Sequence, residues 1–296
     1  MRPVLVLGAT GMLGHKLMQH WAERYRCSGT IRADAPAPAL AGLLGAERIH
    51  GGVSAFDPET VAAAIDAEAP DVVVNCIGVV KQADAAADPV TSIRVNSLFP
   101  HELAATCRHR GTRLIHISTD CVFTGRRGAY TEGDAPDPED LYGRSKLLGE
   151  VAAPGALTLR TSIIGRELTN DYGLVEWLIG NRGGAVRGFT RAIFSGLTTG
   201  ALADQIALLI DDAPDVHGVW HLSADAIDKN SLLVKLDEAL ELGIAIQPDD
   251  RVALDRSLDS TRLREAIGAQ PPSWAEMIEG LAQDETPYDE IRRELA

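Results

Sequence analysis

The segment DLYGRSK, residues 140–146, contains two side chains that could move a proton together. Tyr142 and Lys146 are four positions apart, and residues at that spacing share one face of a helix. A phenol has a reference pKa of about 10, and a neighbouring ammonium stabilises the phenolate and lowers that value toward neutrality. The same spacing is common on ordinary helix surfaces, so the rest of the chain has to decide whether the pair is catalytic.

The glycine-rich turn GATGMLG, residues 8–14, is the second candidate site. It follows the apolar run of residues 4–9 and opens a helical pattern. Glycines at such a turn allow a tight bend, close approach of the backbone to a pyrophosphate, and close packing of the helix on the strand. The spacing is G-x-x-G-x-x-G rather than G-x-G-x-x-G, but its place between a strand and a helix predicts dinucleotide binding. The predicted cofactor contacts from this turn are Gly8, Thr10, Gly11, Met12, Leu13 and Gly14.

The end of the second predicted strand indicates which dinucleotide is bound. An acidic residue about 20 positions after the glycines favours NAD, whereas an arginine there favours the 2′-phosphate of NADP. Counting along the chain selects Asp34. Strand geometry selects Arg32, because the residue that leaves the strand faces the ribose while Asp34 is already in the loop. We therefore expect NADP(H) rather than NAD(H).

Short apolar runs alternate with helical patterns through the first half of the chain. The runs cover residues 4–9, 27–32, 71–78, 113–119 and 157–164. They are continuous and rich in β-branched residues, which is typical of parallel strands covered on both faces. The sequence therefore predicts an α/β fold with a doubly wound (Rossmann) parallel sheet. The C-terminal part is expected to form a smaller α+β region that binds the substrate.

The predicted boundaries divide the chain into an NADP-binding Rossmann domain and a substrate-binding region. The Rossmann domain covers residues 1–165, with a helix and a strand returning to it around residues 198–224. The substrate-binding region covers residues 166–197 and 225–296. Within it, NRGGAVRGFTR (residues 181–191) is interpreted as a glycine–arginine loop. Residues 225–296 are interpreted as two helical stretches and a proline-punctuated tail.

The composition is that of a globular protein and limits the class of partner. The 296 residues carry a formal net charge of −14. This charge argues against duplex nucleic acid and anionic membranes, because neutralising phosphates needs clustered Lys and Arg. The four cysteines have no metal-like or disulfide-like spacing, and no apolar run reaches the roughly 20 residues of a membrane helix. We expect no metal site, and a cytoplasmic monomer or homodimer.

Six motifs occur in the order and at the separations found in one enzyme family. They are GATGMLG, VVNCIG, STDCVFTG, YTEGDAPDP, YGRSK and LRTSIIG, and FSGLTT extends the likeness more weakly. With them the chain resembles the extended short-chain dehydrogenase/reductase superfamily. Within that superfamily it is most similar to the dTDP-4-dehydrorhamnose reductase family, the nucleotide-sugar 4-ketoreductases. The resemblance covers roughly the first 165 residues.

The resemblance implies roles for individual residues of these motifs. Tyr142 is the proton donor and acceptor, Lys146 holds the cofactor ribose, and Thr119 hydrogen-bonds the substrate oxygen. The cofactor contacts that the resemblance adds are Val53, Cys76, Ile77 and Gly78, and the substrate contacts that it adds are Thr119, Asp120 and Ile163.

Three arginines outside these motifs are assigned to the substrate. A nucleotide sugar carries a diphosphate, and arginine can bind it with two hydrogen bonds at once. We expect Arg187, Arg191 and Arg256 to supply these contacts, since they lie in predicted loops beyond the cofactor half.

Together these residues predict NADPH-dependent reduction of the 4-keto group of a nucleotide-activated deoxysugar. Cys121 follows Asp120 where related nucleotide-sugar dehydratases carry a glutamate that assists proton removal, so dehydration is disfavoured. Two alternatives stay open. One is an epimerase that keeps NAD(P) bound. The other is a non-catalytic NADP-binding regulatory subunit, like the family member that regulates methionine adenosyltransferase.

Overall fold

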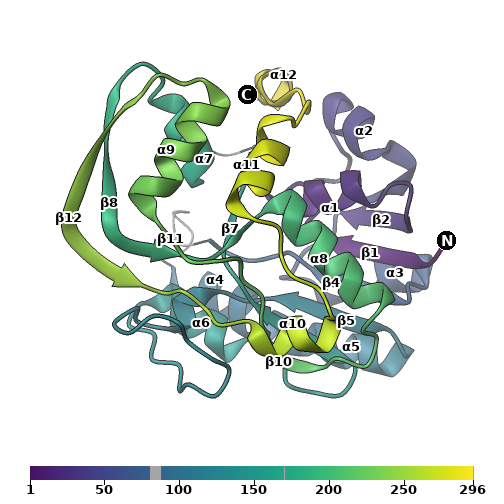
Figure 1. Cartoon of the computed structure of the whole chain (residues 1–296). Helices are drawn as coiled ribbons and strands as arrows, with labels where there is room; N and C mark the ends of the chain where they lie inside the picture. The colour runs from purple at the N-terminus through teal and green to yellow at the C-terminus, as the bar shows by residue number, and fades with distance from the viewer. Residues whose placement is uncertain (81–87, 170, 296) are drawn as a thin grey trace.

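A seven-stranded parallel sheet forms the larger part of the protein (Figure 1). The computed structural model describes residues 1–80, 88–169 and 171–295. The strand order is β3-β2-β1-β4-β5-β6-β10, and each pair of neighbours runs parallel. This is the order of a Rossmann sheet, so the predicted fold class is confirmed. The strands are β1 (Pro3–Leu7), β2 (Arg26–Thr30), β3 (Ile49–His50), β4 (Val72–Asn75), β5 (Arg113–Ile117), β6 (Ala156–Arg160) and β10 (Gly218–His221).

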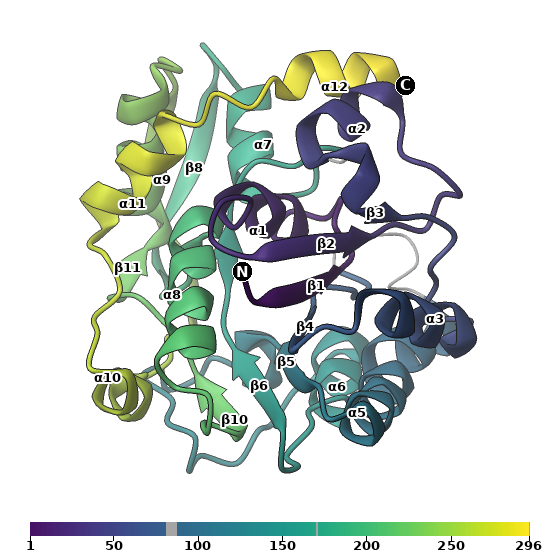
Figure 2. The ribbon, with the colours of Figure 1, turned by 90° about the vertical axis from the view of Figure 1, so that its right-hand side faces the viewer.

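Helices cover both faces of this sheet, as its continuous apolar strands require (Figure 2). In β1, Val4 and Val6 join the core that also contains α1 and α8. Leu5 and Leu7 point to the opposite face and join the core that contains α3 and α5. The helices of the two layers are α1 (Gly14–His20), α2 (Pro38–Leu44), α3 (Pro58–Glu68), α5 (Phe99–Arg110) and α8 (Thr199–Asp211). The helix and strand expected to return around residues 198–224 correspond to α8 and β10.

A second sheet, of order β11-β8-β12, forms the core of the smaller region at the left of Figure 1. Its strands are β8 (Ala185–Phe194), β11 (Ile227–Asp228) and β12 (Ala245–Asp255). Helix α9 (Lys229–Leu240) packs on β8 and β12, and α7 (Leu174–Gly180) packs on α9.

The interpretation of residues 181–191 as a loop is wrong, because most of them belong to β8. This strand pairs in parallel with β12 along most of its length. Gly188 interrupts its apolar pattern, and a side chain there would lie 2.4 Å from Asn230 Oδ1 of α9. Glycine is therefore required for the helix to pack on the strand. The partner strand was missed because most of β12 is exposed and polar residues interrupt its apolar pattern.

The end of the chain returns to the Rossmann half. Helix α10 (Thr261–Ile267) packs beside β10, and α11 (Trp274–Ala282) packs against α8 and α9. Helix α12 (Tyr288–Leu295), which the sequence analysis grouped with the substrate-binding region, packs against α2 in both views (Figures 1 and 2).

Several short elements complete the connections. The predicted strand at 157–164 is divided into β6 and β7, and β7 pairs with β9 outside the main sheet. These short elements are β7 (Ile163–Ile164), β9 (Leu197–Thr198), η1 (Ala46–Arg48), α4 (Pro89–Ser92), η3 (Ile93–Leu98), η4 (Asp120–Val122) and α6 (Leu141–Leu148). Within the described residues, no helix combines the length and the apolar character needed to cross a bilayer.

Candidate active site

The carboxyl ends of β1, β4 and β5 meet at one edge of the sheet. Leu7 of β1 is in register with Asn75 of β4, and Asn75 is in register with His116 of β5. The glycine turn leaves β1, residues 76–78 leave β4, and Thr119 follows β5. The strand order reverses between β1 and β4, and open α/β sheets bind ligands at such a switch point. The predicted cofactor-binding and catalytic segments therefore lie together.

The glycine turn has the geometry that its three glycines predict. Gly8 has a φ of 84°, which disfavours other residues, and a side chain at Gly14 would lie 2.0 Å from the carbonyl oxygen of Gly8. The Gly11 N–H donates to that carbonyl over 3.1 Å. A side chain at Gly11 would meet only the Gly8 oxygen within 4 Å among the described residues, so this side of the turn is open to a ligand. Thr10 and Met12 are partly exposed, while Leu13 is buried.

The backbone after β4 passes beside Lys146. A side chain at Gly78 would lie 3.8 Å from Lys146 Nζ and 3.4 Å from Asn96 Oδ1. Asn96 holds this stretch by accepting from the Val79 N–H over 2.9 Å and donating to the Val79 carbonyl over 3.1 Å. Ile77 is held in the same way, because its N–H donates to Asn75 Oδ1 over 3.0 Å. An open glycine turn and a glycine in front of a lysine fit a dinucleotide that runs along this edge.

The residues assigned to the adenosine end lie at the carboxyl end of β2. Val53 is buried, and its N–H donates to the Ile31 carbonyl over 3.0 Å. Arg32 and Asp34 are both exposed beside it. Val53, Arg32 and Asp34 therefore lie close together, and the two candidate ribose ligands, Arg32 and Asp34, are both accessible to a cofactor.

Helix α6 carries Tyr142 to the strand end that contains Thr119. A side chain at Gly143 would lie 2.3 Å from the carbonyl oxygen of Cys121, so the glycine next to the tyrosine lets the helix touch η4. Asp140 caps the helix by accepting from the Gly143 N–H over 2.8 Å. The Thr119 hydroxyl accepts from the Cys121 N–H over 3.1 Å and also interacts with the Tyr142 phenol.

Burial, rather than the neighbouring ammonium, has the largest influence on the Tyr142 phenol. It raises the pKa of Tyr142, and Cys121 adds to the rise while Thr119 opposes it. The prediction from the sequence spacing, that the pKa of the Tyr142 phenol is lowered, is therefore wrong. Lys146 donates to the Ile117 carbonyl over 2.6 Å, and burial lowers its pKa to about 8.

A buried ion pair that the sequence analysis missed lies behind Lys146. Glu150 accepts from Arg160 Nε and Nη2, each over 2.8 Å, and both side chains are only 6% exposed. Ser118, the neighbour of Thr119, donates to Glu150 Oε1 over 2.9 Å. The negative charge of Glu150 raises the pKa of Lys146 against the effect of burial. The sequence signal that could have indicated Glu150 is its spacing, four positions after Lys146, which places the two on one face of a helical pattern.

The smaller region brings two cations close to residues 120–123, which follow Thr119. Arg256 donates to the Phe123 carbonyl over 2.8 Å and to Cys121 Sγ over 3.6 Å. Lys229, at the start of α9, acts electrostatically on Asp120 together with Arg256, and both oppose the rise in the Asp120 pKa that burial causes. No local pattern marks Lys229 in the sequence, because its neighbours belong to no motif.

The remaining predicted substrate residues lie in different places. Arg187 is 62% exposed on β8 and forms an ion pair with Asp249 over 3.7 Å. Arg191 is exposed on the same strand. Ile163, in β7, is partly buried against the main core. Of the three predicted arginines, only Arg256 has a described contact with the residues that follow β5.

Comparison with known proteins agrees with this arrangement. The family model described as RmlD substrate binding domain matches residues 1–231. A Haloferax volcanii relative, described as a probable low-salt glycan biosynthesis reductase Agl14, is 32% identical over 232 residues, which cover 75% of this chain and 74% of the relative. A Streptomyces antibioticus relative, described as a probable dTDP-4,6-dihydroxy-2-methyloxan-3-one 4-ketoreductase, is 34% identical over 226 residues, or 73% of this chain and 70% of the relative. The methionine adenosyltransferase 2 subunit beta of Danio rerio is 35% identical over 172 residues, or 55% of this chain and 48% of the relative.

Solved structures show the same fold. The dTDP-4-dehydrorhamnose reductase of Bacillus anthracis, in complex with NADP, superposes with a TM-score of 0.77 at 21% identity, over 95% of this chain and 98% of that chain. The match to the family model covers most of the chain, and the Haloferax volcanii and Streptomyces antibioticus relatives, which match more than two thirds of it, are both named as reductases. The chain therefore belongs to the dTDP-4-dehydrorhamnose reductase family of extended short-chain dehydrogenase/reductases, and it is an NAD(P)-dependent oxidoreductase.

Proposed function

We propose that the protein reduces the 4-keto group of a nucleotide-activated deoxysugar with NADPH. The observation that carries this proposal is that Thr119, after β5, interacts with Tyr142, while Lys146 of the same helix lies beside Gly78, after β4. The Streptomyces antibioticus relative named as a 4-ketoreductase supports the same reaction class.

The chain's own residues suit the delivery of a proton to a reduced carbonyl. Bound NADPH would supply the hydride. Tyr142 keeps its proton at neutral pH because burial raises its pKa, so it is ready to act as the donor to the sugar oxygen. We expect the Thr119 hydroxyl, which interacts with the Tyr142 phenol, to hydrogen-bond that oxygen. Lys146, with a pKa of about 8, is mostly protonated at neutral pH and can donate to the cofactor ribose.

The residue after Asp120 favours reduction over dehydration. A dehydratase needs a base at this strand end to remove a proton from the sugar ring. Burial and the charge of Asp120 raise the pKa of the Cys121 thiol to about 12, so the thiol stays protonated at neutral pH. A protonated thiol is no base for that step.

Arg32 supports NADPH as the cofactor in this proposal. It is exposed at the carboxyl end of β2, where the ribose of a dinucleotide lies in a Rossmann fold. A guanidinium there can bind a 2′-phosphate with two parallel hydrogen bonds.

The substrate's diphosphate needs cationic partners, because burying it without them costs several kcal/mol. Arg256 is the best-placed of the three predicted arginines, since it lies next to Cys121. We expect Arg256→Ala to raise the KM for the sugar nucleotide more than Arg187→Ala or Arg191→Ala. If none of the three shifts that KM by more than about twofold, the diphosphate binds elsewhere.

A regulatory subunit is the second candidate function. The match to methionine adenosyltransferase 2 subunit beta favours it, although that match covers about half of each chain. A subunit that only binds nucleotide has no need for Thr119, Tyr142 and Lys146 together, so we prefer the enzyme.

The test is a screen of NADPH oxidation against a panel of 4-keto-6-deoxy nucleotide sugars that differ in base and sugar. Reduction of at least one member, abolished in Tyr142→Phe, is the expected result. Interconversion of two sugars without net NADPH consumption would indicate an epimerase. NADPH binding with no turnover on any member would instead favour the regulatory subunit.

A further inference from the structure

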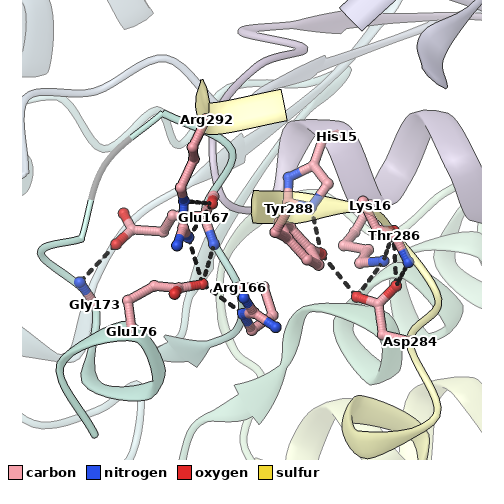
Figure 3. Close-up of polar contacts among 10 residues, drawn as sticks. All are labelled: His15, Lys16, Arg166, Glu167, Gly173, Glu176, Asp284, Thr286, Tyr288 and Arg292. Carbon is pink, nitrogen blue, oxygen red and sulfur yellow. Dashed lines mark hydrogen bonds and ion pairs between the residues drawn. The ribbon is translucent and has the colours of Figure 1, made fainter. Parts of the chain in front are cut away.

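The C-terminal segment, residues 284–295, is anchored on the cofactor half of the protein. Tyr288 is 2% exposed and Ile291 is 1% exposed, and both pack with Leu40 of α2 and Leu168. The family model ends at residue 231, so this segment lies outside the part of the chain that the family match covers. Its polar side chains point toward α1 and toward the loop that precedes α7 (Figure 3).

A chain of polar contacts joins this segment to His15 of α1 (Figure 3), and His15 in turn contacts the glycine turn. The Tyr288 hydroxyl lies 3.0 Å from His15 Nε2 and 2.7 Å from Asp284 Oδ2. Asp284 forms an ion pair with Lys16 over 2.6 Å. His15 Nδ1 lies 2.9 Å from the carbonyl oxygen of Gly11, and a carbonyl can only accept, so Nδ1 carries a proton. Burial lowers the pKa of His15 to about 4, so the ring is neutral at pH 7. The Tyr288 O–H donates to the Asp284 carboxylate, which can only accept. Tyr288, fixed by that bond, holds the far side of the His15 ring through the 3.0 Å contact with Nε2 and through edge-to-face packing with ring centroids 5.7 Å apart.

The bond to Gly11 fixes the direction of a backbone donor in the turn. The carbonyl of Gly11 and the N–H of Met12 belong to one peptide plane, and in a trans peptide they point in opposite directions. The Gly11 carbonyl accepts both from the His15 N–H over 3.2 Å and from the His15 ring. The Met12 N–H is therefore held pointing away from the α12 side.

The same segment also supports the Met12 side chain, through the loop that precedes α7. Arg292 donates to the Glu167 carbonyl and forms an ion pair with Glu176 over 2.7 Å. The carboxylate of Glu167 accepts from the Gly173 N–H over 2.6 Å. A side chain at Gly173 would lie 2.7 Å from Met12 Cε, so this loop packs directly on the methionine.

We propose that the C-terminal segment is a positioning element for pyrophosphate binding, acting through Tyr288, His15 and the Gly11–Met12 peptide. This inference rests on the proposed binding of a nicotinamide dinucleotide at the glycine turn. Tyr288 is a positioning residue in this account, since within the described residues its contact with the turn runs through His15.

The test compares Tyr288→Phe with wild type for binding of NADPH and of 2′-AMP, which keeps the adenosine end but has no pyrophosphate. We expect the Kd of NADPH to rise about three- to tenfold, the range for loss of one buried hydrogen bond. The Kd of 2′-AMP should stay the same, because the Met12 N–H has no partner in that ligand. The KM for NADPH should rise with its Kd, while kcat at saturating NADPH should not fall.

Tyr25→Phe is the matched control. Tyr25 is 3% exposed, and its hydroxyl lies 3.3 Å from the Ala207 carbonyl and 3.0 Å from Asp211 Oδ2. This variant loses a buried phenol hydroxyl that makes no bond to the turn, so its NADPH affinity should equal that of wild type. An equal loss in both variants, or an equal loss for NADPH and 2′-AMP in Tyr288→Phe, would show a general effect on folding and overturn the inference.

A measurement on the unchanged protein covers the case in which Tyr288→Phe fails to fold. Coupling between two sites is reciprocal, so NADPH should slow amide hydrogen exchange in residues 288–295 of wild type, and 2′-AMP should not. Equal exchange with and without NADPH would overturn the inference. If wild type binds NADPH but reduces no keto sugar, the proposed reaction is refuted while the inference about the C-terminal segment still stands. If wild type binds neither NADPH nor NADH, the proposed cofactor and this inference fall together.

Discussion

The buried pair of Glu150 and Arg160 gives a sharp test of how the active site is held together. Glu150→Gln keeps the size of the side chain and an oxygen for the Ser118 hydroxyl, but it removes the negative charge. Arg160 would then be a buried cation without its partner, because both side chains are only 6% exposed. We expect the variant to be markedly less stable than wild type.

The expected loss follows from the burial of the pair. Removing one partner of a buried ion pair costs about 3–5 kcal/mol, and we expect the lower end because glutamine still accepts a hydrogen bond. A domain is stable by about 5–15 kcal/mol, so the variant would lose a large part of its stability. With a urea m-value of about 3 kcal/mol/M, the denaturation midpoint should fall by about 1 M.

Urea denaturation followed by circular dichroism measures this change. Glu139→Gln is the control, since Glu139 pairs with Arg126 at the surface and the two side chains are 68% and 76% exposed. Exposed pairs contribute little, so the midpoint of the control should match wild type. A midpoint for Glu150→Gln within the error of the control would refute the reasoning, and would mean that water or another group neutralises Arg160.

Three further predictions concern activity. Tyr142→Phe should lower kcat by about a hundredfold or more while NADPH still binds, because only the proton donor is lost; a near-wild-type kcat in steady-state assays would remove Tyr142 from the mechanism. Arg32→Ala should weaken NADPH by about tenfold to a hundredfold in titrations and leave NADH unchanged, and equal losses for both would point to Asp34 as the ribose ligand. Lys146 loses its proton as the pH rises through its folded pKa of about 8, so kcat/KM should fall above about pH 8. In Glu150→Gln this fall should begin at lower pH, because the charge of Glu150 raises the pKa of Lys146. A pH profile identical to that of wild type would contradict the assignment of the fall to Lys146.

The Rossmann half was predictable because its signals are local. Continuous apolar runs identified the parallel strands other than β3, which has only two residues, and the glycine turn marked the first crossover. Motif residues at the ends of separate strands then come together without further information, since the carboxyl ends of parallel strands meet at one edge. The glycine turn, residues 76–78 and Thr119 come together in this way.

The second sheet could not be predicted from local sequence patterns. In residues 185–194, Arg187, Gly188 and Arg191 interrupt the apolar pattern that is typical of a buried strand. These residues form a strand because β12 pairs with them. The need for glycine at position 188 becomes apparent only from the packing of α9 against it.

The tertiary structure also decided the electrostatics of the site. The sequence spacing of Tyr142 and Lys146 predicted a lowered phenol pKa, but burial raises it, and burial depends on everything that surrounds the ring. Arg256 reaches Cys121 across 135 positions, and Tyr288 reaches His15 across 273. The amino-acid sequence by itself determined which elements form and which strand ends carry the chemistry, because periodicity and turn geometry act over a few residues. Which distant side chains surround those strand ends was decided only by packing, because such contacts depend on the shape of the whole fold.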